Sequence, residues 1–308
     1  MTKSNITNTA ASVKQRLLNR ARAQKEDFNL LLTKYALERV LYRISQSPHK
    51  NIFVLKGALL FELWTDQTHR PTRDADFLSQ GDNSLERFQK IFEGICAMTV
   101  HDDGLRFDPA SVSVDRIKED QDYEGIRVTF VGYLEASRLP VQIDIGFGDA
   151  ITPEPAETSF PTLLENPAPV LLAYPRETVV AEKFEALVKL GIANTRMKDL
   201  HDLKTLAGLF PFAGPSLSEA IRRTFERRKT PLPLEALPTA LTAAFYSDST
   251  KQMQWNAFVS KNNHYIDPIT LQEVIAAIEV FVMPVLPSSA PPNLPLLQWE
   301  PGGPWKHI

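Results

Sequence analysis

The chain has 308 residues, of which 43% are hydrophobic and 23% charged, and its formal net charge is −3. This composition predicts a globular protein with one large domain or two smaller ones, and it excludes a protein that is basic overall, so any nucleic-acid contact must come from a local basic patch. The single cysteine, Cys96, excludes a disulfide framework and a cysteine-based zinc site. Because no apolar run is long enough to cross a bilayer and the N-terminus lacks a signal-peptide layout, we expect a cytoplasmic protein without membrane contact.

Residues 9–46 show apolar side chains at helical spacing, and Asp27 is a plausible N-cap for the second part of this stretch. Residues 51–55 then form a short apolar strand, which leads through Lys56, Gly57 and Ala58 into an apolar helix over 59–64. Backbone N–H groups at such a corner favour an anion. The alternative is an ordinary turn in which Gly57 supplies the backbone angles.

The stretch from Thr72 to Leu78 is predicted to be a strand that carries Asp74 and Asp76. Side chains at positions i and i+2 of a strand point to the same face, so the two carboxylates aim at one spot. Like charges at this spacing disfavour each other's ionisation unless a cation lies between them, and Mg²⁺ is the natural occupant. The alternative is a surface turn with two solvated acids.

A helix over 85–96 places Cys96 at its buried face as a structural thiol. A run of strands is expected over 106–148, and in the last of them apolar residues alternate with Gln142 and Asp144. Asp144 is therefore a candidate third metal ligand beside Asp74 and Asp76. It could also be an edge-strand acid in solvent.

Residues 151–175 are rich in proline and are expected to be a connector with little regular structure. A helix over 179–191, with Thr178 as a possible cap, carries Lys183 near its start, where the helix dipole does not favour a lysine. Lys183 is thus either a solvated side chain or a functional cation. Another helix opens near Asn194, and Arg196, Asp199, His201 and Asp202 cluster at its beginning.

The most basic patch of the chain lies on the helix that follows residue 216, and it consists of Arg222, Arg223, Arg227, Arg228 and Lys229. It is either a solvated helix face or a contact for a phosphate backbone. Residues 235–262 and 270–281 are expected to be helical. The Pro-rich stretch from residue 284 onward is expected to be an extended or disordered tail.

Five motifs in this order resemble the AbiEii/AbiGii toxin family, which includes the MenT-type toxins. They are the segments 53–59, 70–78, 142–149, 181–187 and 196–203, and the resemblance spans about residues 30–285. It implies an α/β (α+β) fold: a polymerase β-like nucleotidyltransferase core with a mixed sheet, plus a C-terminal helical part. The expected divisions are a core with N-terminal helices over 1–150, the connector over 151–175, a helical domain over 176–283 and a tail over 284–308.

The resemblance also implies a Mg²⁺-dependent nucleotidyltransferase toxin of a type IV toxin–antitoxin or phage-defence system, with a cognate antitoxin. It would transfer a nucleotide from an NTP to RNA, the 3′ end of tRNA in the MenT-type members. By position, Asp74 and Asp76 match the metal-binding pair, Thr72 the hydroxyl residue before it, and Asp144 the third carboxylate around one or two Mg²⁺ ions. Lys183 matches the catalytic helix lysine and Asp199 the acid that follows it, with Asp202 as the alternative match.

Lys56, Gly57 and Ala58 match the nucleotide-binding turn of the family, with one departure. The family usually has Gly-Ser or Gly-Gly-Thr there, and Ala58 offers no hydroxyl to a phosphate. Two further hypotheses therefore remain open. One is the same chemistry on a protein hydroxyl, as in an AMP-transferring enzyme. The other is an inactive nucleotide-binding module.

Overall fold

The computed structural model describes residues 8–65, 69–120, 123–287 and 297–307. The chain divides into two compact units. The first unit contains residues 1–148 and 156–173, and the second contains residues 149–155 and 174–308. The chain therefore passes from one unit to the other three times. The division into a core, a connector, a helical domain and a tail stays a prediction.

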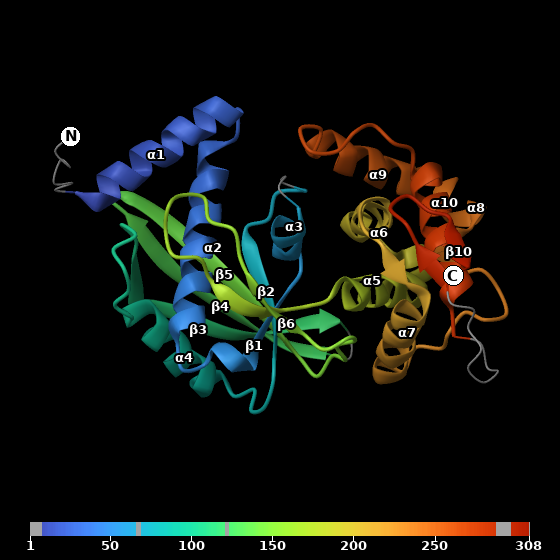
Figure 1. Ribbon diagram of the computed structural model, residues 1–308, viewed down its shortest axis with the longest axis horizontal. Helices are drawn as coiled ribbons and strands as arrows, with labels where there is room; N and C mark the ends of the chain where they lie inside the picture. The colour runs from blue at the N-terminus through green and yellow to red at the C-terminus, as the bar shows by residue number, and fades with distance from the viewer. Residues whose placement is uncertain (1–7, 66–68, 121–122, 288–296, 308) are drawn as a thin grey trace. The chain divides into compact units, whose positions relative to one another are not determined.

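The first unit begins with helices α1 (Thr9–Gln24) and α2 (Phe28–Gln46), which meet at a bend (Figure 1). The bend arises because Lys25 adopts a left-handed conformation with φ of 55°, and the Asp27 carboxylate then caps α2 by accepting a hydrogen bond from the Leu30 amide. Two further helices, α3 (Leu59–Trp64) and α4 (Leu85–Ala97), follow at the predicted places.

A seven-stranded sheet forms the centre of the first unit, with strand order β3-β4-β5-β2-β1-β7-β6. Strand β2 pairs with β1 in an antiparallel and with β5 in a parallel arrangement, so the predicted mixed sheet of an α/β fold is confirmed. The strands are β1 (Phe53–Lys56), β2 (Asp74–Ser79), β3 (Arg106–Asp120), β4 (Tyr123–Leu134), β5 (Ser137–Phe147), β6 (Ala156–Ser159) and β7 (Val170–Ala173).

The apolar face of this sheet is built around aromatic side chains. Phe53 of β1 makes edge contacts with Phe77 of β2 and with Phe88 and Phe92 of α4. All four rings are fully buried. Because side chains alternate along a strand, a strand that buries Phe77 on this face points Asp76 to the other one. The core of the unit thus fixes which face the carboxylates occupy.

The prediction that residues 151–175 have little regular structure is wrong for part of the segment. Strand β7 pairs in parallel with β1, and β6 pairs with β7 at the edge of the sheet. Leu171 and Ala173 are buried there. Each strand has only four residues, which is too short for alternation to be distinguished from a proline-rich loop.

The second unit contains helices α5 (Arg176–Leu190), α6 (Met197–Leu209), α7 (Gly214–Arg228), α8 (Ala243–Tyr246), α9 (Ser249–Lys261) and α10 (Leu271–Val282). The expected continuous helix over 235–262 is instead a 3₁₀ turn followed by α8 and α9, because Asp248 caps α9 by accepting from the Lys251 amide. Helix α5 begins at Arg176 after Pro175. Thr178 therefore does not cap it, and its hydroxyl is hydrogen-bonded to the backbone of Thr152.

The C-terminal stretch is not an extended tail over residues 297–307. Strands β8 (Phe212–Ala213), β9 (Leu297–Trp299) and β10 (Trp305–His307) form a second sheet of order β10-β9-β8. The expectation for residues 288–296 lies outside the described residues. Within the part of the chain that the structure describes, no helix combines the length and apolar character that a membrane crossing requires.

Candidate active site

Three carboxylates of the first unit converge on the polar face of the sheet. The parallel register of β2 and β5 places Asp76 opposite Asp144 and Asp74 opposite Gln142. One oxygen atom from each of Asp74, Asp76 and Asp144 lies within 4.8 Å of the other two. We call these residues the acidic trio. The surface-turn and edge-strand alternatives are excluded, because both Asp74 and Asp76 belong to a strand inside the sheet and Asp144 is 8% exposed.

Asp74 is oriented by the residue that the sequence analysis placed beside it. The Thr72 hydroxyl, which is buried, donates a hydrogen bond of 2.6 Å to Oδ1 of Asp74. A hydrogen bond to a carboxylate favours its charged form and fixes its rotation. Thr72 therefore fixes the rotation of the Asp74 carboxylate.

Arg127 is a site residue that the sequence analysis missed. Its Nε and Nη2 atoms donate to Oδ1 and Oδ2 of Asp144 at 2.8 and 2.7 Å. Hydrogen bonding to Asp144, with the added charges of Asp144, Asp74 and Asp76, raises the pKa of the Arg127 guanidinium although its partial burial opposes this. The antiparallel register of β4 and β5 places Arg127 opposite Asp144. No local pattern in the sequence predicts this register, and Arg127 could therefore not be identified from the sequence.

The turn after β1 brings backbone close to the trio. Gly57 has a φ of 77°, and a methyl group in its place would overlap the Asp76 carboxylate. Lys56, the preceding residue, pairs with Asp76 across the β1–β2 ladder. Only glycine meets both the backbone conformation and the space at this position. The nucleotide-binding role of Lys56, Gly57 and Ala58 stays a prediction.

The donor atoms of the acidic trio suit a hard divalent cation. All three are carboxylate oxygens, which are the ligands that Mg²⁺ takes in phosphoryl-transfer sites. Arg127 neutralises one of the three charges from the Asp144 side. The residues present therefore fit one or two Mg²⁺ ions at the face that Asp74 and Asp76 share.

A second polar cluster lies within the second unit. The Lys183 Nζ atom of α5 is 2.6 Å from Oδ1 of Asp199 and 2.9 Å from Oδ2 of Asp202, both on α6. Arg196 contacts the other oxygen of Asp199 at 2.7 Å. Burial disfavours the charged form of Asp199, but Lys183 and Arg196 outweigh it and lower the pKa of that carboxyl.

Lys183 is therefore not the solvated side chain that was one of its two interpretations, since only 14% of it is exposed. Asp199 and Asp202 hold its ammonium group in place. A half-buried lysine with two carboxylate partners fits the interpretation as a functional cation, and its catalytic role stays a prediction.

Three arginines of the basic patch on α7 form ion pairs or hydrogen bonds with other residues of the protein. The Arg228 side chain is 12% exposed, and its guanidinium forms ion pairs with Asp149, Glu182 and Glu185 at 2.9 to 3.4 Å. Arg222 is exposed but bridges Glu219 and Glu226 on its own helix. Arg223 donates to the Thr152 hydroxyl. These contacts weaken the hypothesis that Arg222, Arg223, Arg227, Arg228 and Lys229 form an RNA-binding face.

Comparison with protein families matches residues 39–277 to the family described as nucleotidyl transferase AbiEii toxin, type IV TA system. The chain belongs to this family. The resemblance drawn from the five motifs is thereby confirmed, and the protein is a nucleotidyltransferase toxin of a type IV toxin–antitoxin system. Membership implies a nucleotide substrate and a cognate antitoxin.

Solved structures give a weaker likeness. A candidate nucleotidyltransferase from H. pylori is 16% identical, with 83% of this chain and 93% of that chain covered and a TM-score of 0.45. The Helicobacter pylori protein JHP933 is also 16% identical. The match covers 83% of this chain and 91% of that chain, with a TM-score of 0.44. No curated protein matches the chain. The assignment to the AbiEii family therefore rests on the sequence match.

Proposed function

We propose that this toxin transfers a nucleotidyl group from an NTP to the 3′ end of an RNA, with tRNA as the acceptor class, and that it does so with Mg²⁺ bound by Asp74, Asp76 and Asp144. The observation that carries the proposal is the convergence of one oxygen from each carboxylate within 4.8 Å. When bound, Mg²⁺ would offset the negative charge that develops on the phosphate oxygens. We also propose a cytoplasmic site of action, where NTP and tRNA are both present.

The proposed transfer needs no reactant besides the NTP and the RNA hydroxyl. The oxygen of the RNA hydroxyl forms a bond to the α-phosphorus of the NTP, and the bond from that phosphorus to the bridging oxygen breaks. Pyrophosphate leaves with the bonding electrons, and the hydroxyl proton passes to a carboxylate of the acidic trio. Thr72 keeps Asp74 turned toward the reacting groups through its 2.6 Å hydrogen bond.

We propose that residues of the nucleotide-binding turn and of the second unit position the NTP phosphates and offset their charge. Gly57 keeps the space beside the Asp76 carboxylate open, and the backbone of the turn with Lys56 and Ala58 would contact the phosphates. Lys183 would offset phosphate charge, and Asp199 and Asp202 position its ammonium group. The protein need not form a covalent bond to the nucleotide, because enzymes accelerate phosphoryl-type transfers mainly by positioning the reactants and stabilising charge.

One observation favours the inactive-module hypothesis as a second candidate. Ala58 is the N-cap of α3 and makes no side-chain hydrogen bond there, so no hydroxyl is available to a phosphate at this corner. The acidic trio favours the active enzyme, because three converging carboxylate oxygens are the ligands that a hard divalent cation takes. We therefore keep the active enzyme as the proposal.

The test is label transfer from each of the four radiolabelled NTPs in the presence of tRNA, total RNA or protein. We expect label on RNA with the wild type. Asp76→Asn should reduce transfer by at least about a hundredfold, since metal charge stabilisation is worth several kcal/mol. Glu86→Gln, at an exposed acid in the first turn of α4, is the matched control and should transfer normally.

Binding of Mn²⁺, followed by electron paramagnetic resonance, gives a readout that does not depend on turnover. Asp76→Asn should weaken it, whereas Glu86→Gln should not. Label found only on protein would refute the RNA acceptor and support the AMP-transferring alternative. No transfer from any NTP, together with unchanged Mn²⁺ binding in Asp76→Asn, would refute the proposed enzyme altogether.

A further inference from the structure

A hollow of about 620 Å³ opens beside the acidic trio. Its end nearest the trio is lined by Gln142 and by Arg73, the neighbour of Asp74. The Nε2 atom of Gln142 donates to the two carboxylate oxygens of Asp144 at 3.4 and 3.2 Å. The hollow continues along β4 and β5 and reaches α2 at Asn29 and Thr33. We call it the β5 groove.

The β5 groove follows the same face of the sheet as the trio. Asp144, Gln142 and Arg138 are separated by even numbers of residues along β5 and so point the same way. The β4–β5 register adds Thr129, which lies opposite Gln142. From Asp144 to Arg138 the strand covers ~20 Å. The groove is therefore long enough for several nucleotides of an extended strand that ends at the trio.

The charge of the groove suits a polyanion. Among the described residues that line it, none is acidic, while Arg73 and Arg138 are both exposed. Neither arginine makes an ion pair with any residue that the structure describes, in contrast to Arg222 and Arg228 of α7. Gln142 and Thr129 add neutral hydrogen-bond donors between the two charges. An unpaired guanidinium is the side chain best matched to a phosphate group.

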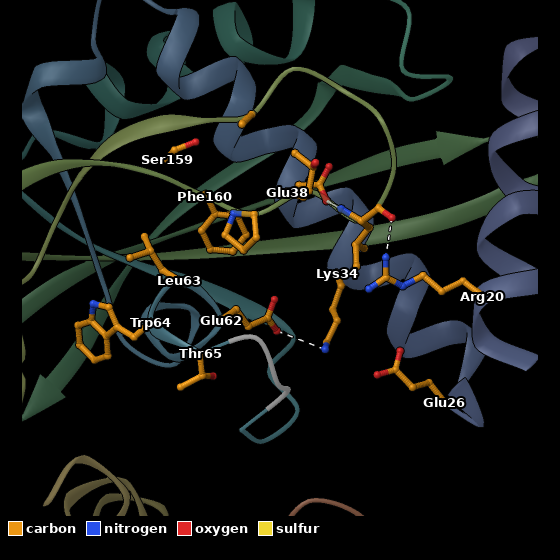
Figure 2. Close-up of a pocket in the computed structure, with 14 residues that line it drawn as sticks. Arg20, Glu26, Lys34, Glu38, Glu62, Leu63, Trp64, Thr65, Ser159 and Phe160 are labelled. Carbon is orange, nitrogen blue, oxygen red and sulfur yellow. Dashed lines mark hydrogen bonds and ion pairs between the residues drawn. The ribbon is translucent and has the colours of Figure 1, made fainter. Parts of the chain in front are cut away.

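A second hollow, formed by described residues of the first unit, has a different character. Figure 2 shows this hollow, of about 590 Å³, with the side chains of Glu26, Glu38 and Glu62 on its walls. Its lysine, Lys34, points toward Glu62 and pairs with it at 3.3 Å. Its lining combines these three acids with Arg20 and Lys34, so it offers no excess of positive charge to a phosphate backbone. Of these two hollows, the β5 groove is the better suited to RNA.

The order of the strands assigns the groove to the acceptor rather than to the NTP. The trio lies on β2 and β5, the Gly57 turn lies on the β1 side of it, and the groove lies on the β4 side. In-line displacement requires the attacking hydroxyl and the leaving pyrophosphate on opposite sides of the phosphorus. With the NTP phosphates at the Gly57 turn, the attacking hydroxyl comes from the side of the groove.

We propose that the β5 groove binds the single-stranded 3′ end of the acceptor RNA, with Arg73 and Arg138 contacting its phosphates. This inference rests on the proposed function, because it takes RNA as the acceptor. It names the surface that delivers the RNA hydroxyl to the acidic trio. It also replaces α7 as the predicted RNA contact.

The experiment measures binding of a 5′-labelled single-stranded RNA oligonucleotide by fluorescence anisotropy as a function of salt, with the full-length protein. The double substitution Arg73→Ala/Arg138→Ala should weaken binding at least about tenfold at 0.1 M salt, and the slope of log K against log salt should fall by about 0.7 for each arginine. The KM for RNA should rise with little change in the KM for NTP.

Two matched variants make the result specific. Arg16→Ala removes an exposed arginine of α1 that does not line the groove and should bind RNA like the wild type. Arg222→Ala tests the α7 patch. An unchanged salt slope in the double variant, or a larger loss in Arg222→Ala, would overturn the groove assignment. So would a rise confined to the KM for NTP. Absence of RNA binding by the wild type would instead refute the proposed acceptor.

Discussion

Arg127 and Asp144 show how three carboxylates can share one spot in this fold. Asp144 is 12% exposed at its side chain and is held by a two-pronged ion pair to a guanidinium that is 41% exposed. Three like charges at this spacing would otherwise repel one another. The arginine therefore acts as a resident counter-ion and limits the repulsion before any metal binds.

Removing this counter-ion should strengthen metal binding. In Arg127→Ala we expect Mn²⁺ affinity to increase by about fivefold, because a partly exposed ion pair is worth about 1 kcal/mol and the released carboxylate is free to bind the ion. Calorimetric titration with Mn²⁺ measures the effect. Arg127→Lys keeps the charge and should stay close to the wild type. Weaker Mn²⁺ binding in Arg127→Ala would show that Arg127 mainly orients Asp144.

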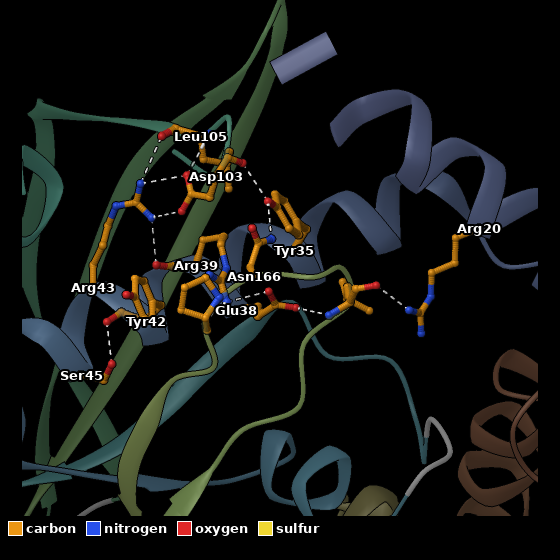
Figure 3. A network of polar contacts seen from close by, with 12 residues as sticks. Arg20, Tyr35, Glu38, Arg39, Tyr42, Arg43, Ser45, Asp103, Leu105 and Asn166 are labelled. Atoms are coloured by element: carbon orange, nitrogen blue, oxygen red, sulfur yellow. Dashed lines mark hydrogen bonds and ion pairs between the residues drawn. The ribbon is translucent and has the colours of Figure 1, made fainter. Parts of the chain in front are cut away.

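The element that ties the first unit together is helix α2, which carries several buried charges. Figure 3 shows Arg43 pointing at Asp103, with hydrogen bonds of 2.6 and 3.1 Å to its two carboxylate oxygens. Glu38 accepts a hydrogen bond of 2.6 Å from the Leu163 amide and pairs with Arg39 at 2.8 Å. The helix thus fixes two loops that are distant in the sequence. A helical pattern predicts the helix but not these partners.

Glu38 should make stability depend on pH. Burial raises the pKa of its carboxyl to about 7, despite the opposing charge of Arg39. Between about pH 4.5 and 7 the unfolded chain loses this proton while the folded chain keeps it, so stability falls as pH rises, by about 3 kcal/mol in total. In Glu38→Gln this contribution disappears.

Urea unfolding at pH 5 and pH 8 measures the effect. The free energy of unfolding of the wild type, relative to Glu38→Gln, should be lower at pH 8 than at pH 5. Glu86→Gln, at an exposed acid of the same unit, should show the pH dependence of the wild type. Parallel pH curves for the wild type and Glu38→Gln would contradict a raised pKa at this position.

At the scale of the whole chain, its last described residues complete the second unit. Trp299 lies 5.0 Å from Phe281 and 5.3 Å from Trp305, measured between ring centroids, and its Nε1 donates to the Ala207 carbonyl at 2.7 Å. Burial of the Trp299 and Phe281 rings explains why residues 297–307 form strands in a stretch with a Pro-rich composition. Composition describes the average of a segment, whereas a few large aromatic side chains supply enough buried area to fix it.

Trp299→Ala should therefore destabilise the second unit by about 3–5 kcal/mol, the usual cost of removing a buried tryptophan. Chemical unfolding followed by circular dichroism measures it. Trp305→Phe keeps a ring in the cluster and loses only the hydrogen bond to the Phe281 carbonyl, so it should cost about 1 kcal/mol. Equal and small losses in both variants would mean that β9 and β10 add little to stability.

The sequence by itself determined the features that follow from short-range periodicity and spacing. The alternation around Asp74, Asp76 and Asp144 predicted a shared face, and the order of five motifs predicted the family. Only the tertiary structure decided the contacts between distant strands and helices: the Arg127–Asp144 pair, the β5 groove, the ion pairs of Arg228 and the sheet formed by β8, β9 and β10. The physical reason is that strand register and helix packing choose partners across the chain, and a local pattern of residue types does not encode that choice.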